Sequence, residues 1–126
     1  MRKLALFLLM TVGITLGASM NTLNASQRAQ IPTGGEIPDE RKRDRNPEKT
    51  TEVVRHVQDN VYVIAGIGSN ISVLPGTDVI LIVDAQYQEF TPKILAGIKQ
   101  IADGPVRFLI DTHSHVDHTG GNAPRE

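Results

Sequence analysis

The sequence predicts a mixed α/β (α+β) domain built on one mainly antiparallel sheet. Short runs of β-branched and aromatic residues are separated by turn residues, which is typical of hairpins. A segment with apolar residues at helical spacing lies between two apolar runs, 79–83 and 106–110, and so indicates a strand–helix–strand unit. A loop rich in histidine and aspartate follows the second run directly, and ligand sites favour the carboxyl ends of such strands.

The composition divides the 126 residues into three segments. Residues 1–25 are predicted to be a signal peptide, residues 26–50 a flexible linker, and residues 51–126 a folded domain. The middle segment is rich in proline and glycine and carries a mixed-charge run over 39–49, which cannot bury enough apolar surface to fold alone. Nucleic-acid binding is not expected, because acidic and basic residues alternate there and the net charge is −1.

The first segment begins Met1-Arg2-Lys3 and continues with an apolar run over residues 4–17. A short basic start before an apolar run predicts a secretory signal peptide, and this run is shorter than the roughly 20 residues of a membrane span. An uncleaved N-terminal anchor is the alternative. In both cases the rest of the chain is expected to be exported, as a periplasmic or secreted protein with no membrane contact beyond the leader. The chain has no cysteine, so disulfide bonds play no part in this expectation.

The domain is predicted to begin with two hairpins. Residues 51–57 and 61–65 form the first pair of strands, and residues 71–74 and 79–83 form the second. The unbroken apolar run 79–83 predicts a strand that is covered on both faces.

A helix is predicted to follow, with Thr91 as its N-cap and Pro92 at its first position. Gly104 and Pro105 end it. Residues 106–110 then form a buried strand that leads into the histidine-rich loop. The apolar face of the helix consists of Ile94, Leu95, Ile98, Ile101 and Ala102.

Three of the four histidines and one aspartate occupy six consecutive positions, as His113, His115, Asp117 and His118. Imidazole nitrogen and carboxylate oxygen are the usual non-sulfur ligands of zinc. In an extended segment the first three can point the same way, and a turn over 119–121 can bring His118 to the same site. The spacing predicts two metal ions, one held by the histidine pair and one by the adjacent aspartate and histidine. The alternative is a polar loop without metal.

The segment that contains these residues, Thr-His-Ser-His-Val-Asp-His-Thr-Gly-Gly-Asn, resembles the H-x-H-x-D-H signature of the metallo-β-lactamase fold hydrolases. The resemblance implies a partial αββα sandwich in which His113 and His115 bind the first metal and Asp117 and His118 bind the second. It also implies that Asp117 is the catalytic residue that orients the attacking water. Two zinc ions are expected, and iron or manganese would suit the same ligands.

Two further residues have a structural and a functional interpretation. Asp84 ends the apolar run 79–83 and can simply begin a turn. The resemblance implies instead that Asp84 lies beside the metal loop, where it would orient ligands through hydrogen bonds without touching the metal. His56 lies in the first predicted strand, far along the chain from the motif, and is interpreted as an ordinary strand histidine.

The resemblance covers about Val53 to Asn122 and looks like the first third of such a hydrolase domain. The family's later ligands, two histidines and a bridging carboxylate, have no counterpart in the chain. The expected function is therefore the N-terminal fragment of an exported hydrolase in which a metal-bound hydroxide attacks an ester, thioester, lactone or lactam carbonyl. The alternative is a truncated, inactive chain that is at most a weak metal-binding module. The family spans β-lactamases, lactonases, sulfatases and nucleases, so the motif indicates a chemistry and not a particular substrate. A small-molecule substrate is the expected partner, with no organic cofactor and the oligomeric state left open.

Overall fold

The computed structural model describes residues 25–37, 39 and 43–122. The predicted signal peptide lies outside these residues, apart from Ala25. None of the helices in the described part has both the length and the apolar sequence needed to span a membrane. The elements follow in chain order as helix α1 (Ala25–Arg28), strands β1 (Val53–Gln58), β2 (Val61–Ala65), β3 (Asn70–Pro75) and β4 (Ile80–Val83), 3-10 helix η2 (Gln88–Phe90), helix α2 (Thr91–Ile101), strand β5 (Val106–Ile110), helix α3 (Val116–Thr119) and 3-10 helix η3 (Gly120–Asn122).

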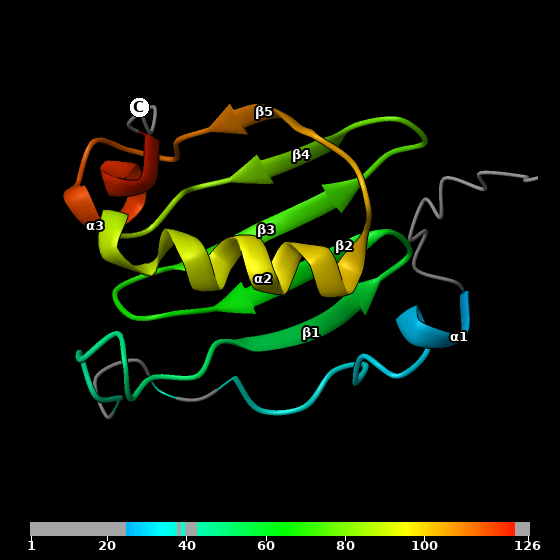
Figure 1. The fold of residues 1–126 in the computed structure, drawn as a ribbon, viewed down its shortest axis with the longest axis horizontal. Helices are drawn as coiled ribbons and strands as arrows, with labels where there is room; N and C mark the ends of the chain where they lie inside the picture. The colour runs from blue at the N-terminus through cyan, green and yellow to red at the C-terminus, as the bar shows by residue number, and fades with distance from the viewer. Residues whose placement is uncertain (1–24, 38, 40–42, 123–126) are drawn as a thin grey trace, which may run out of the picture.

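The five strands form one sheet in the order β1-β2-β3-β4-β5 (Figure 1). The first four strands pair antiparallel with their sequence neighbours, whereas β5 pairs parallel with β4 after the crossover through α2. This mainly antiparallel sheet with its strand–helix–strand unit confirms the predicted α+β fold class. Because β4 and β5 run in the same direction, the residues that follow them leave the sheet at the same end. There the Asp84 N–H donates to the Ile110 carbonyl oxygen at 2.8 Å.

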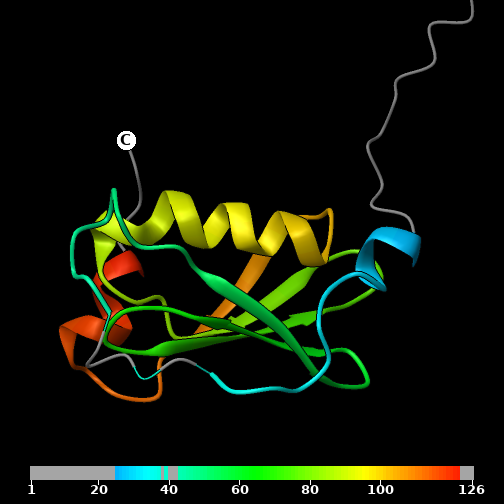
Figure 2. The same cartoon turned by 90° about the horizontal axis from the view of Figure 1, so that it is seen from below.

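Helix α2 covers one face of the sheet, as the view from below shows (Figure 2). Alternate strand residues face the helix, because successive side chains of a strand point to opposite faces. Ile64 and Ile71 are fully buried on this face, and Ile98 of the helix is 4% exposed. The core also contains Ile31, Val54, Tyr62, Ile67, Val73, Ile80, Ile82, Phe90, Ile94, Ile101 and Ala102.

Strand β5 is exposed, which corrects the prediction of a buried strand over 106–110. Phe108 is 57% exposed and Ile110 is 53% exposed. Among the described residues, the strand is the last in the sheet and so has a neighbouring strand on one side only. An apolar run reports hydrophobicity alone and does not reveal how many layers pack on the strand.

Strand β4 differs from its prediction in the same way. Ile80 and Ile82 are buried on the helix side, whereas Leu81 and Val83 on the other side are half-buried. The strand is therefore fully covered on one face and not on both. On the side opposite α2, exposure among the described residues rises from Ala65, which is fully buried, to Phe108 and Ile110 of β5, which are more than half exposed.

Helix α2 begins at Thr91, so this residue is not the N-cap that the sequence predicts. The preceding η2 turn runs directly into the helix, with Phe90 at the cap position. The Thr91 hydroxyl instead donates to the Gln88 carbonyl oxygen at 2.8 Å. The prediction that Leu95 belongs to the buried face of the helix is also wrong, since this side chain is 43% exposed. Successive residues of a helix are about 100° apart around its axis, so Leu95 points away from the face on which Ile94 is buried.

The described residues of the segment 26–50 contact the domain. Ile31 is 9% exposed and belongs to the core. The segment runs beside β1, where the His56 N–H donates to Pro32 at 2.9 Å and the Gly34 N–H donates to His56 at 3.0 Å. The composition of the segment does not indicate these contacts, and the domain boundaries stay predictions.

Candidate metal centre

The metal-ligand type side chains lie in the loop that leaves β5 and in helix α3. The chain bends directly after the strand, and His115 is extended (φ −66°, ψ 146°) at the start of α3. Asp117 and His118 therefore project from a helix. This corrects the prediction that His113, His115 and Asp117 alternate along an extended segment. The turn that brings His118 to the site is α3 itself and begins before residues 119–121.

The three histidines and Asp117 lie against one another at the end of the sheet. His113 Nε2 is 2.9 Å from His115 Nδ1, and the rings of His113 and His118 have centroids 4.0 Å apart. His118 Nε2 is 3.4 Å from Asp117 Oδ2. The side chains of His118 and Asp117 are 17% and 24% exposed, whereas His113 and His115 are exposed. The motif thus forms one cluster that is open to solvent on the side of the first two histidines.

Asp84 contacts this cluster from the sheet side. Its side chain is buried, and its Oδ2 atom is 2.9 Å from His118 Nδ1. Its Oδ1 atom accepts from the Thr112 N–H at 2.8 Å and from the Thr112 hydroxyl at 2.9 Å. The backbone of Asp84 is left-handed (φ 65°), a conformation that aspartate tolerates better than most residues. The contact fits a role in orienting His118, and that role stays a prediction.

The hydrogen bonds of Asp84 control its ionisation. Burial by itself raises the pKa of this carboxyl, but the bonds from the Thr112 N–H, the His118 ring and the Thr112 hydroxyl, together with the His118 charge, hold the pKa below its ordinary value of 3.8. Asp84 is therefore an anion at neutral pH. In the neutral form of the His118 ring, the Asp84 carboxylate favours the tautomer with its proton on the facing Nδ1, in which Nε2 carries the lone pair.

The cluster has the donor atoms of a zinc site at a closer spacing than zinc requires. Within residues 25–37, 39 and 43–122, no three His, Cys, Asp or Glu side chains are already arranged to hold a metal ion. His113 and His115 share a hydrogen bond across 2.9 Å, whereas two nitrogens on a tetrahedral zinc at about 2.0–2.1 Å are about 3.3 Å apart. A cation on both nitrogens would require the rings to separate by about 0.4 Å and the proton between them to move to the other nitrogen of its ring, so that each facing nitrogen has a lone pair. The donor chemistry of the cluster therefore fits a divalent cation.

Three residues that the sequence does not single out support the cluster. The Thr112 hydroxyl lies 3.1 Å from His113 Nδ1 and 3.3 Å from His118 Nδ1. Ser69 and Gln86 reach it from distant loops: Ser69 Oγ donates to the Asp117 carbonyl oxygen at 2.5 Å, and Gln86 Nε2 donates to the Ser69 carbonyl oxygen at 2.9 Å. A hydroxyl directly before the motif is a signal that could identify Thr112. The other two carry no such signal.

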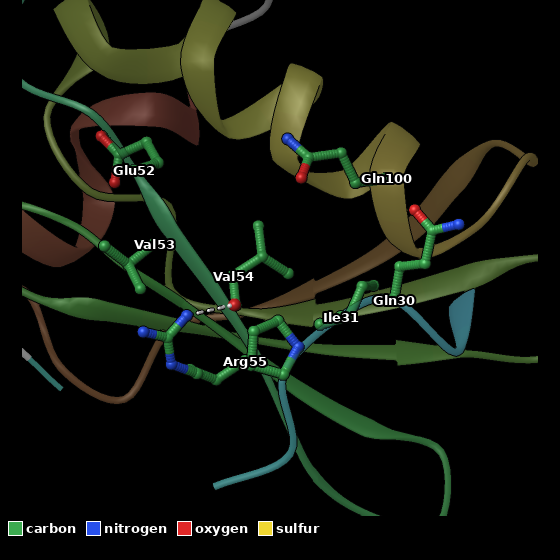
Figure 3. A pocket seen from close by; sticks show the side chains of 8 residues that line it. Gln30, Ile31, Glu52, Val53, Val54, Arg55 and Gln100 are labelled. Carbon is green, nitrogen blue, oxygen red and sulfur yellow. Dashed lines mark hydrogen bonds between the residues drawn. The ribbon is translucent and has the colours of Figure 1, made fainter. Parts of the chain in front are cut away.

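A cavity of about 570 Å³ lies away from this cluster, between β1 and α2 (Figure 3). In Figure 3 the Glu52 carboxylate, the Gln100 amide and the Arg55 guanidinium do not point toward a common centre. We therefore assign the candidate site to the histidine cluster, whose side chains do meet. The cavity is lined by Gln30, Ile31, Pro32, Glu52, Val53, Val54, Arg55 and Gln100.

Glu52 has a carboxylate whose oxygen atoms are shielded from solvent. Neither of its carboxylate oxygens has a partner in the described part of the chain. Burial raises its pKa above the ordinary value of 4.5, and the positive charges of Arg43 and Lys93 only partly oppose this. Both cations donate to backbone carbonyl groups instead, Lys93 to Thr50 and Arg43 to Gly66.

Comparison with known proteins gives a local similarity to one kind of enzyme. No family model matches the chain. Over 68 residues the chain is 34% identical to the alkyl/aryl-sulfatase BDS1 of Saccharomyces cerevisiae. This match covers 52% of the chain and 10% of the relative, so the chain spans about a tenth of the length of the curated relative it matches.

Proposed function

We propose that this chain carries the metal-binding edge of a metal-dependent hydrolase of the metallo-β-lactamase type. The observation that carries the proposal is the cluster of His113, His115, Asp117 and His118 beside the buried Asp84 carboxylate. Imidazoles and carboxylates packed this densely at the end of a sheet gain little without a cation to bind. The similarity to an alkyl/aryl-sulfatase supports the same class of enzyme.

Each side chain has a role in this proposal. His113 and His115 bind one divalent cation, zinc being the expected metal, and Asp117 and His118 bind a second. When bound, the cations supply Lewis-acid activation of water and of a substrate oxygen. Asp84 orients His118 by accepting a hydrogen bond from its Nδ1–H group, which presents Nε2 to the site.

Asp117 is the proposed catalytic residue. Its carboxylate is partly exposed and lies beside His118, so it can accept a hydrogen bond from a water molecule in the site and fix the direction of attack. The substrate approaches from the open side of the cluster, where His113 and His115 are exposed. A sulfate ester is the first substrate class, because the relative is an alkyl/aryl-sulfatase. Carboxylic esters, thioesters, lactones and lactams are the second class, which the resemblance of the motif supports.

The proposal includes export, because the basic start and the apolar run over 4–17 are those of a secretory leader. The competing function is a metal-binding module without turnover. The exposure of His113 and His115 favours this alternative, since an open site with few ligands binds metal weakly.

Metal content tests the ligand assignment. We expect the protein expressed from its whole gene to take up two zinc ions per chain, measured by equilibrium dialysis and mass spectrometry of the metal. His115→Ala should remove one ion, because it deletes one of two nitrogens that hold the first cation. His56→Ala is the matched control, since this ring contacts Thr33 and the Asp59 carbonyl oxygen away from the cluster, and it should keep both ions. Unchanged zinc content in His115→Ala would exclude the assignment.

Turnover separates the two functions. The same preparation and the 126-residue chain are assayed side by side with 4-nitrophenyl sulfate, a thioester and a reporter lactam. Zinc-dependent hydrolysis of any of them supports the enzyme, and the preferred reporter identifies the substrate class. Zinc uptake with no hydrolysis by either preparation would reject the enzyme in favour of the metal-binding module.

A further inference from the structure

Helix α3 is too short to fix the position of Asp117 by itself. It has four residues and none of its side chains is buried. Isolated helices of this length are unstable in water, since one turn of hydrogen bonds does not offset the cost of ordering the backbone. The orientation of the Asp117 carboxylate therefore depends on contacts from other parts of the chain.

The loop between β2 and β3 supplies such a contact. Ser69 in this loop is 5% exposed, and its Oγ atom donates to the Asp117 carbonyl oxygen at 2.5 Å. In a longer helix this carbonyl would accept from the N–H four residues later, which belongs to Gly121. That N–H donates instead to Gln86 at 2.9 Å. The Ser69 hydroxyl thus takes the place of a missing helical hydrogen bond.

The same loop also packs closely against the Asp117 side chain at Gly68. A Cβ atom added at Gly68 would lie 2.9 Å from the Cβ of Asp117 and 2.7 Å from the ring of Tyr87. Gly68 also has a left-handed backbone (φ 91°), which disfavours a larger residue. The start of the Asp117 side chain is therefore held between the loop and its own helix.

Gln86 fixes the loop in turn. Its side chain is fully buried, and Nε2 donates to the Ser69 carbonyl oxygen at 2.9 Å. The amide fills the space beside Gly66, where an added Cβ would lie 1.3 Å from Nε2. Gln86 itself follows Asp84 by two residues, so one short segment orients His118 through Asp84 and the Ser69 loop through Gln86.

We propose that Ser69 is a positioning residue for Asp117, with Gln86 holding Ser69 in place, and that this pair sets the affinity of the second cation site. The assignment rests on the proposed function of the cluster. Ser69 does not touch the cation. It acts by fixing the backbone from which the Asp117 ligand projects, as groups around metal ligands commonly do.

The test is a cobalt(II) titration of the whole-gene protein by calorimetry and visible absorption. We expect Ser69→Ala to weaken the second binding step by about 10- to 100-fold and to leave the first step unchanged. Turnover should fall in kcat with KM retained. Ser69→Thr keeps the hydroxyl and should restore both, and Ser72→Ala, on the sheet face away from α2, is the matched control.

The outcomes separate this inference from the function on which it rests. Wild-type protein that takes up no cobalt would reject the proposed function. If the wild type binds two ions and Ser69→Ala binds both as tightly as the wild type does, the role of Ser69 is overturned and the proposed function is not. Where Ser69→Ala does not fold, Ser69→Cys replaces it, because a thiol fills nearly the same space and donates only weakly. An unweakened second step in that variant would also overturn the role.

Discussion

At the scale of single residues, two shielded carboxylates show what decides their ionisation. Asp84 accepts hydrogen bonds from Thr112 and His118, and its pKa lies below the ordinary value. Glu52 has two positive charges nearby but no hydrogen bond in the described part of the chain, and its pKa lies above the ordinary value. Hydrogen bonds therefore compensate burial where charges at a distance do not.

Asp84→Asn should destabilise the fold by about 2 kcal/mol at pH 7, because an amide cannot accept all the hydrogen bonds that the carboxylate accepts. The folded pKa of Asp84 is lowered, so its contribution to stability is fully present above pH 3.8 and is lost as the pH falls through the folded value. The free-energy difference between wild type and variant, measured by urea unfolding at pH 7 and pH 3, should therefore shrink at pH 3. Asp78→Asn, at an exposed carboxylate, should show neither effect. A difference that stays constant with pH would contradict this account.

Glu52→Gln should stabilise the fold at pH 7, whereas Asp84→Asn should destabilise it. The folded pKa of Glu52 is raised, so its favourable contribution is complete below pH 4.5 and disappears as the pH rises through the folded value. A neutral amide avoids the burial of charge, and we expect a gain of about 1 kcal/mol at pH 7 that vanishes near pH 4, measured by urea unfolding. Glu48→Gln, at an exposed position, is the control. Loss of stability at pH 7 would show that Glu52 has a partner that compensates its charge.

At the scale of elements, turn residues and periodicity predict the strands and the helix well. Strands β2 and β5 have the predicted bounds, and the other strands differ by one or two residues. Burial is predicted less well. The pattern that places Ile98 on the buried stripe of α2 also includes Leu95, which is exposed. The width of a buried stripe depends on the shape of the sheet beneath it, and the sequence of the helix does not contain that information.

The helix therefore offers a matched pair of substitutions. Ile98→Ala should cost about 2–4 kcal/mol, because it leaves a cavity between α2 and the sheet. Leu95→Ala should change stability by less than about 0.5 kcal/mol, since the side chain is 43% exposed and alanine favours helices. Both values come from chemical unfolding monitored by circular dichroism. Equal losses for the two variants would mean that the open side of α2 is covered in solution.

At the scale of the whole molecule, the dominant feature is an exposed apolar patch at the β5 end of the sheet face opposite α2. Phe108 and Ile110 pair in register with Leu81 and Val83, so all four project on the side opposite α2. The first two are more than half exposed. Contiguous apolar surface of this kind promotes association between molecules, especially beside a strand that forms the edge of the sheet in the described part of the chain.

We expect the 126-residue chain to associate as its concentration rises, measured by size-exclusion chromatography with light scattering. Phe108→Lys should reduce the association, because it places a charge at the most exposed point of this face. Val57→Lys, on β1 at the opposite edge of the sheet, should have little effect. A chain that remains monomeric at all concentrations, or equal effects of both variants, would contradict this expectation.

The candidate site was predictable where its residues are consecutive in the sequence. Four ligand-type residues within six positions identify the cluster from the sequence alone. Their arrangement was not predictable, because the extended segment expected there is a bend followed by α3. The supporting contacts of Ser69 and Gln86 arise only when the β2–β3 loop and the loop after β4 meet, and no local pattern records such long-range contacts.

The parallel pairing of β5 with β4 has a consequence for the order in which the sheet folds. Strands β1 to β4 join partners that are adjacent in the chain, whereas β5 reaches β4 only across the α2 crossover. Closing that longer loop costs more entropy, so we expect this edge to form after the hairpins and to open before them. The loop that contains His113 and His115 directly follows β5 and so depends on this edge of the sheet. If the proposed cations bind there, they would stabilise the folded edge over the opened one, and we expect metal uptake to follow the formation of the rest of the sheet.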